Sequence, residues 1–82
     1  MSISKEKYLN AIVRLDVADF NYKPGNHIAS FGLIAGDAAK EHNKALDAGN
    51  YKLALEYAKI VSNYNEKARR DERYQDEHHE DD

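Results

Sequence analysis

Apolar residues recur at helical spacing in three segments of the chain. The first segment carries five of them on one face of a helix: Leu9, Ile12, Val13, Val17 and Phe20. This spacing predicts a helix over about residues 4–21, with Ser2 or Ser4 able to cap its start. Pro24 and Gly25 follow in the segment NYKPGN, where their preference for tight turns predicts that the helix has ended.

A second helix is predicted over residues 27–48, with one face formed by Ile28, Phe31, Ala35, Ala38, His42 and Ala45. A later start is also possible, because Asp37 can cap a helix that begins only there and leave residues 28–36 as a short helix or turn. A neighbouring row holds small residues: Ala29, Gly32, Gly36 and Ala39. Such a strip allows another helix, or another copy of the chain, to approach closely, and we expect oligomer packing at Gly32, Gly36, Ala39 and Ile60.

A third helix is predicted over residues 51–73, after a corner at Gly49 and Asn50. Gly49 can adopt the left-handed conformation that ends a helix, and Asn50 can cap the next one. This helix carries two adjacent apolar stripes, one of Leu53, Tyr57, Ile60 and Tyr64 and one of Ala54, Ala58, Val61 and Ala68. Two stripes indicate contact with both other helices or with a second copy of the chain.

These segments predict an all-α fold, in which a long antiparallel helical hairpin packs with the first helix in a small three-helix arrangement. Residues 71–82 carry a net charge of −6, whereas residues 1–70 carry +3. We therefore expect a helical domain of residues 1–73 and a disordered acidic tail of residues 74–82. The tail either keeps the protein in solution or competes for a basic groove on another protein.

The corner sequence AGNYKLALEYA resembles the helical hairpin of tetratricopeptide repeats and MIT domains. The residues that carry the resemblance are Gly49, Asn50, Tyr51, Ala54, Leu55 and Tyr57. It extends over about residues 38–64 and departs from the repeat pattern at His42 and Ala45, where those families have glycine and an aromatic residue. The resemblance implies a hairpin that binds a peptide or a helix of a protein partner.

Catalytic and metal-binding patterns are absent from the sequence. With no cysteine, the chain has neither disulfides nor thiolate ligands, and Asp37 follows the glycine pair of FGLIAGD where a phosphate loop requires lysine. His42 with a nearby carboxylate makes at most half a metal site, so we expect it to be a partly exposed residue at the edge of an interface. No catalytic residue, metal or cofactor is predicted.

Candidate binding residues are tyrosines and basic residues: Tyr57, Tyr64, Lys67, Arg69, Arg70 and Lys23. The two tyrosines, one heptad apart, lie either at the edge of the core or on a contact surface for a partner. The basic residues of the third helix either complement its C-terminal dipole or, together with Lys23, bind an anion such as a nucleotide or nucleic acid.

We therefore expect a small non-enzymatic protein–protein interaction module that acts as an adaptor, regulator or inhibitor. The alternative is an oligomeric binder of a nucleotide or of nucleic acid. Charges at Lys5, Glu6, Lys7 and Arg14 interrupt any apolar run near the start, so no secretory signal is expected. The longest charge-free run, residues 24–36, is too short to cross a membrane. A cytoplasmic location and a homo-oligomer, with a dimer favoured, are expected, and the economy of size suits a phage or plasmid accessory protein.

Overall fold

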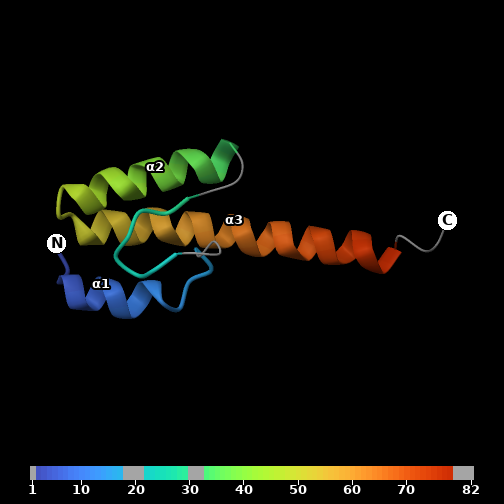
Figure 1. Ribbon diagram of the computed structural model, residues 1–82, viewed down its shortest axis with the longest axis horizontal. Coiled ribbons are helices and arrows are strands. Elements are labelled where there is room, and N and C mark those ends of the chain that lie inside the picture. Colours follow the sequence, from blue (N-terminus) through green and yellow to red (C-terminus); the bar gives the residue numbers. More distant parts are fainter. Residues whose placement is uncertain (1, 18–21, 30–32, 79–82) are drawn as a thin grey trace.

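The computed structural model describes residues 2–17, 22–29 and 33–78, with side chains described for these residues except Leu33 and 72–78. The described residues form three helices: α1 (Lys5–Ile12), α2 (Leu33–Asp47) and α3 (Tyr51–His78). In Figure 1, α2 and α3 run antiparallel side by side, and α1 lies on the other side of α3. The described residues contain no strand, so the predicted all-α fold is confirmed.

The corner between α2 and α3 has the structure that its sequence predicts. Gly49 has a φ of 75°, and its N–H donates to the carbonyl of Leu46 at 3.0 Å. The N–H of Asn50 donates to the carbonyl of Ala45 at 2.8 Å, which completes a Schellman motif. The side chain of Asn50 then accepts a hydrogen bond from the N–H of Leu53 and caps α3.

Helix α1 is much shorter than the predicted helix over residues 4–21. It begins as expected, because the Ser4 hydroxyl accepts a hydrogen bond from the N–H of Lys7, but it ends at Ile12. The chain then turns, and two side chains of α3 bind the backbone of Asp16. Its N–H donates to Ser62 Oγ at 2.9 Å, and its carbonyl accepts from Asn65 Nδ2 at 2.7 Å. These tertiary hydrogen bonds replace those of a longer helix. Residues 18–21, including Phe20, lie outside the described residues.

Helix α2 also starts later than residue 27, and it does not start at Asp37. Residues 27–29 are not helical, because the side chain of Asn43 binds both backbone groups of Ile28. Both predicted starts are therefore wrong, since the helix begins at Leu33 and Asp37 lies within its second turn. The predicted turn at Pro24 and Gly25 is present, with Gly25 at a φ of 93° and the N–H of Asn26 donating to the carbonyl of Lys23.

Helix α3 begins at Tyr51 as predicted but continues to His78 instead of ending at Arg73. Residues 74–78, which were expected to be part of a disordered tail, are helical, and residues 79–82 lie outside the described residues. At a rise of about 1.5 Å per residue, α3 is roughly 42 Å long and α2 roughly 22 Å. Figure 1 shows the consequence: the C-terminal half of α3 extends beyond both other helices.

Alanine dominates the contact between α2 and α3. Six alanines of these two helices are buried: Ala35, Ala38, Ala39, Ala45, Ala54 and Ala58. Small side chains let the two helices pack closely, and Ile12, Val17, Ile28 and Val61 complete the core. Ala39, which was expected in an oligomer contact, therefore packs inside its own chain; Gly36 is half-buried in α2, and Gly32 lies outside the described residues.

Candidate functional site

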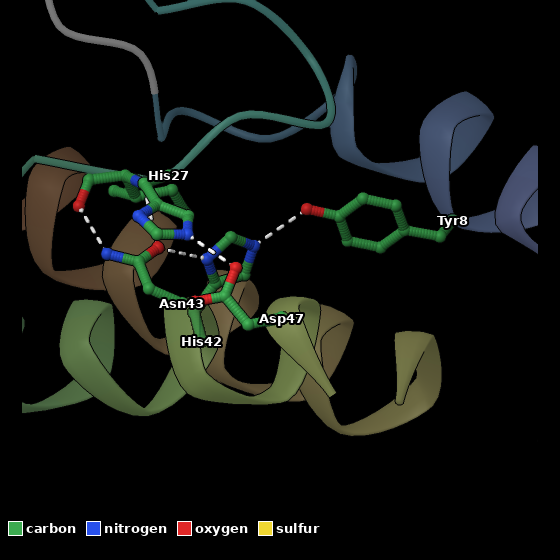
Figure 2. Close-up of polar contacts among 6 residues, drawn as sticks. Tyr8, His27, His42, Asn43 and Asp47 are labelled. Carbon is green, nitrogen blue, oxygen red and sulfur yellow. Dashed lines mark hydrogen bonds and ion pairs between the residues drawn. The ribbon is translucent and has the colours of Figure 1, made fainter. Parts of the chain in front are cut away.

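A buried hydrogen-bonded pair, Tyr8 and His42, links α1 to α2. Both side chains are fully buried, and the Tyr8 hydroxyl lies 2.7 Å from His42 Nε2. Figure 2 shows Tyr8 reaching across from α1 to the imidazole. The Tyr8 ring also packs against Tyr51 of α3, with 5.5 Å between ring centroids. This single side chain therefore contacts both helices of the hairpin.

Asn43 fixes the proton positions in this pair. Its Nδ2 donates to the carbonyl of Ile28 at 3.1 Å, and its Oδ1 accepts from the N–H of Ile28 at 2.8 Å, so the amide can point only one way. The same Oδ1 lies 2.8 Å from His42 Nδ1, which must therefore carry the hydrogen. His42 Nε2 is then an acceptor, and the Tyr8 hydroxyl donates to it (Figure 2).

Burial has shifted the acid–base properties of the cluster. It lowers the pKa of His42 and raises the pKa of Tyr8, so both groups are neutral near pH 7. The pKa of Tyr22 is also raised by burial, and its hydroxyl has no hydrogen-bond partner of good geometry. A histidine between a hydroxyl and an amide resembles a catalytic arrangement, but no substrate reaches a fully buried pair. Its evident role is to hold α1 on the hairpin.

His42 is thus not the partly exposed residue that the sequence suggested. A polar residue on an otherwise apolar helix face was the available signal, since such a residue needs a buried partner. His27 instead pairs at the surface with Asp47 at 2.8 Å, to the side of the buried cluster (Figure 2). Across the part of the chain with described side chains, histidines and carboxylates form no cluster of metal-ligand size.

A second polar contact fastens the chain after α1 to α3. The Arg69 guanidinium binds both carboxylate oxygens of Asp16, through Nε at 2.7 Å and Nη2 at 3.0 Å. Ser62 and Asn65 bind the backbone of the same residue. Three side chains along one face of α3, those of Ser62, Asn65 and Arg69, therefore bind Asp16. Arg69 was a predicted binding residue, but its guanidinium forms an ion pair with Asp16 of the same chain.

The opposite side of α3 carries an exposed apolar stripe. Four large apolar side chains are exposed among the residues described, and two of them, Leu53 (37%) and Ile60 (45%), lie seven residues apart on α3. Tyr57, between them, and Tyr64, four residues beyond Ile60, are half-buried. Steps of four and three residues continue to the exposed Lys67 and Asp71. We call these six residues the α3 seam: Leu53, Tyr57, Ile60, Tyr64, Lys67 and Asp71.

A shallow depression of about 280 Å³ extends the seam onto α2. Its lining combines seam residues with Ala68 and with Ile34, which is 67% exposed at the start of α2: Ile34, Tyr64, Lys67, Ala68 and Asp71. An apolar floor with one cation and one carboxylate suits a side chain of another protein better than a phosphate, because Asp71 would repel an anion.

The structure thus brings together four of the predicted residues, Tyr57, Ile60, Tyr64 and Lys67, along one helix face. Arg70 is exposed on the same helix, and Lys23 is exposed in the turn that precedes α2. Sequence reasoning did not predict that Leu53, Ile34 and Asp71 contribute to this surface, although it placed Leu53 on an apolar stripe. None of the helices, over their described residues, is both long and apolar enough to cross a membrane.

Comparison of the chain with known protein families, with curated proteins and with solved structures finds no match. The resemblance to tetratricopeptide repeat and MIT hairpins therefore stays a prediction that rests on the corner residues.

Proposed function

We propose that this chain is a protein–protein interaction module whose binding surface is the α3 seam together with Ile34. The observation that carries this proposal is the position of the exposed apolar residues. Leu53 and Ile60 lie on one stripe with two tyrosines between and beyond them, and Ile34 lines the depression at its end. A contiguous apolar stripe that ends in charged residues is typical of a protein-binding surface.

The chemistry of the seam favours a helix or a short segment of protein as the occupant. Tyrosine offers a broad apolar ring and a hydroxyl that stays hydrogen-bonded, and it is enriched at the energetically important positions of interfaces. Lys67 and Asp71 at the open end supply one charge of each sign, which sets orientation more than affinity.

A binding role is favoured over a catalytic one by the location of the perturbed groups. The described residues with shifted pKa values are Tyr8, Tyr22 and His42, all in or beside the interior cluster rather than in the depression. We further propose that the module works in the cytoplasm as an adaptor, regulator or inhibitor, in keeping with its small size and lack of cysteine.

Site-specific photo-crosslinking tests this proposal. A photo-reactive amino acid replaces Ile60 in one variant and Val13, which is 61% exposed after α1, in the control. Irradiation in the expressing cell should give a discrete crosslinked band from position 60 and none from position 13. Equal or no crosslinking at the two positions would contradict the proposal. The mass of the band also shows whether the partner is another copy of the chain or a different protein.

A further inference from the structure

We infer that the occupant of the α3 seam is a second copy of this chain, bound antiparallel through the same seam. This inference rests on the proposed function and names its partner. Three features of α3 support it: the spacing of the seam, the match between its two halves, and the order of the charges beside it.

The seam has the spacing of a two-stranded coiled coil. Leu53, Ile60 and Lys67 are seven residues apart, and so are Tyr57, Tyr64 and Asp71. Such alternation of three- and four-residue steps keeps one stripe facing a partner helix along its length. Helix α3 runs unbroken through all six positions, which cover about five turns. None of the three side chains that bind Asp16, those of Ser62, Asn65 and Arg69, lies on this stripe.

The two halves of the seam match when a second α3 lies antiparallel with its midpoint at the turn around Ser62. Ile60 of each copy then lies opposite Tyr64 of the other, which forms an apolar centre. Tyr57 lies opposite Lys67 of the other copy, where an ammonium group can bind the face of a ring. Leu53 and Asp71 form the outer layer, so apolar contacts lie centrally and charges lie at the rim.

Charge order selects the antiparallel orientation. Glu56 and Arg70 flank the seam on the same side, fourteen residues apart and on opposite sides of the midpoint. In the antiparallel pair, Glu56 of each copy lies beside Arg70 of the other, which gives the ion pair twice. In a parallel pair in register, Lys67 would face Lys67 and Asp71 would face Asp71, and like charges in a seam repel.

The antiparallel arrangement also covers the part of α3 that its own chain leaves bare. The N-terminal half of α3 lies beside α2, whereas the C-terminal half extends beyond it (Figure 1). Reversing the second copy places each extended half along the hairpin of the other. Ile34, which lines the depression beside Tyr64, then lies near Ile60 of the second copy. Such pairing adds buried surface to a chain too short to bury much alone.

Sedimentation equilibrium of charge-reversal variants tests this inference. The wild-type chain should be a dimer at micromolar concentration. Glu56→Arg and Arg70→Glu should each weaken dimerisation by at least about tenfold, because each turns two attractive pairs into two repulsive ones. An equimolar mixture of the two variants should restore association, since both pairs are complementary in the mixed dimer. Arg14→Glu, at an exposed position after α1, serves as the control and should have no effect.

Three results would overturn the inference: a wild-type monomer at all concentrations, dimerisation insensitive to both reversals, or variants that fail to recombine. None of these decides the proposed function by itself. If position 60 crosslinks to a different protein while the purified chain is monomeric, the proposed function is supported and the inference of a second copy is contradicted. If position 60 gives no specific crosslink and the chain is monomeric, both the proposed function and the inference of a second copy are contradicted.

Discussion

The two sides of α3 differ in how their side chains are used. The side that faces α1 is closed: Ser62, Asn65 and Arg69 hold Asp16, and Tyr8 reaches His42 with every polar atom of that pair bonded. The seam side is open, with Leu53 and Ile60 exposed and, among the residues that the structure describes, no polar contact that fixes its side chains. One helix thus serves two purposes, with hydrogen bonds on one side specifying the fold and apolar side chains on the other left for a partner.

Apolar packing and polar contacts make different contributions to the fold. The core of the hairpin is mostly alanine, which gives close packing but little apolar area per residue. Polar side chains supply the specificity that the alanines do not, because Asn43, Ser62 and Asn65 each bind a defined backbone site and Arg69 binds the carboxylate of Asp16. The closed side should therefore be sensitive to single polar substitutions, and the open side should tolerate them without unfolding.

The largest expected effect on the closed side comes from Asn43→Leu. The substitution leaves the N–H and carbonyl of Ile28 and the Nδ1–H of His42 without their partner, and three lost bonds should cost about 3 kcal/mol of unfolding free energy. Urea unfolding followed by circular dichroism measures the change. Asn10→Leu, at an exposed position of α1, is the matched control and should change stability by less than about 0.5 kcal/mol. Equal effects at the two positions would refute the role given to Asn43.

Two buried tyrosine hydroxyls of the closed side should differ in their contribution to stability. Tyr8→Phe removes the donor to His42 Nε2 and leaves a buried acceptor unpaired, which should cost about 1–2 kcal/mol. Tyr22→Phe removes a buried hydroxyl that has no hydrogen-bond partner of good geometry, so this variant should be as stable as the wild type or slightly more stable. Thermal melts of the two variants give the ranking, and a Tyr22→Phe variant less stable than Tyr8→Phe would contradict it.

Acid should loosen the closed side through His42. Burial holds the pKa of folded His42 below its ordinary value of about 6.5, so the unfolded chain takes up a proton at higher pH than the folded chain. Stability should thus begin to fall as pH drops through about 7.5 and fall more steeply below about 6.5, by at most about 1.4 kcal/mol per pH unit, whereas this group contributes almost no pH dependence above about pH 7.5.

Urea unfolding of two histidine variants over this pH range identifies the responsible ring. His27→Gln should keep the acid sensitivity, because His27 is exposed, and His42→Gln should lose it along with some stability at every pH. Acid sensitivity that disappears with His27 instead would assign the effect to the surface pair with Asp47.

Among the substitutions that remove a polar contact of the closed side, Arg69→Met is expected to cost least. The guanidinium binds Asp16 through two contacts but is largely exposed, so solvent screens the pair and its loss should cost about 0.5–1 kcal/mol. Arg14→Met is the control and should be neutral in the same urea titration. A loss above about 2 kcal/mol would mean that the Asp16 contact matters as much as the buried cluster.

Sequence reasoning succeeded where structure depends on neighbouring residues. The caps at Ser4 and Asn50, the left-handed Gly49 and the turn at Pro24 and Gly25 follow from local conformational preferences. It failed where distant side chains override those preferences. The helical pattern around Val17 and Ile28 is real, but Ser62, Asn65 and Asn43 bind the backbone there from 15 to 49 residues away. No spacing rule identifies such partners.

The seam was partly predictable for the same reason. Leu53, Tyr57, Ile60 and Tyr64 form a stripe in the sequence, but only the position of α2 and α1 determines which of the two stripes is left open. Arg69 illustrates the limit: next to Arg70 in the sequence, it is bound to Asp16, whereas Arg70 is exposed beside the seam.

Distances between spin labels on two copies of the chain test the central claim most directly. The chain has no native cysteine, so Lys52→Cys and Lys59→Cys each carry one label, on exposed positions outside the seam. Antiparallel pairing about Ser62 predicts axial separations of about 30 Å between labels at position 52 and about 9 Å at position 59, from the helical rise. Equal distances at the two positions would indicate a parallel pair, and no dipolar signal at either would mean that the α3 seam does not bind a second copy.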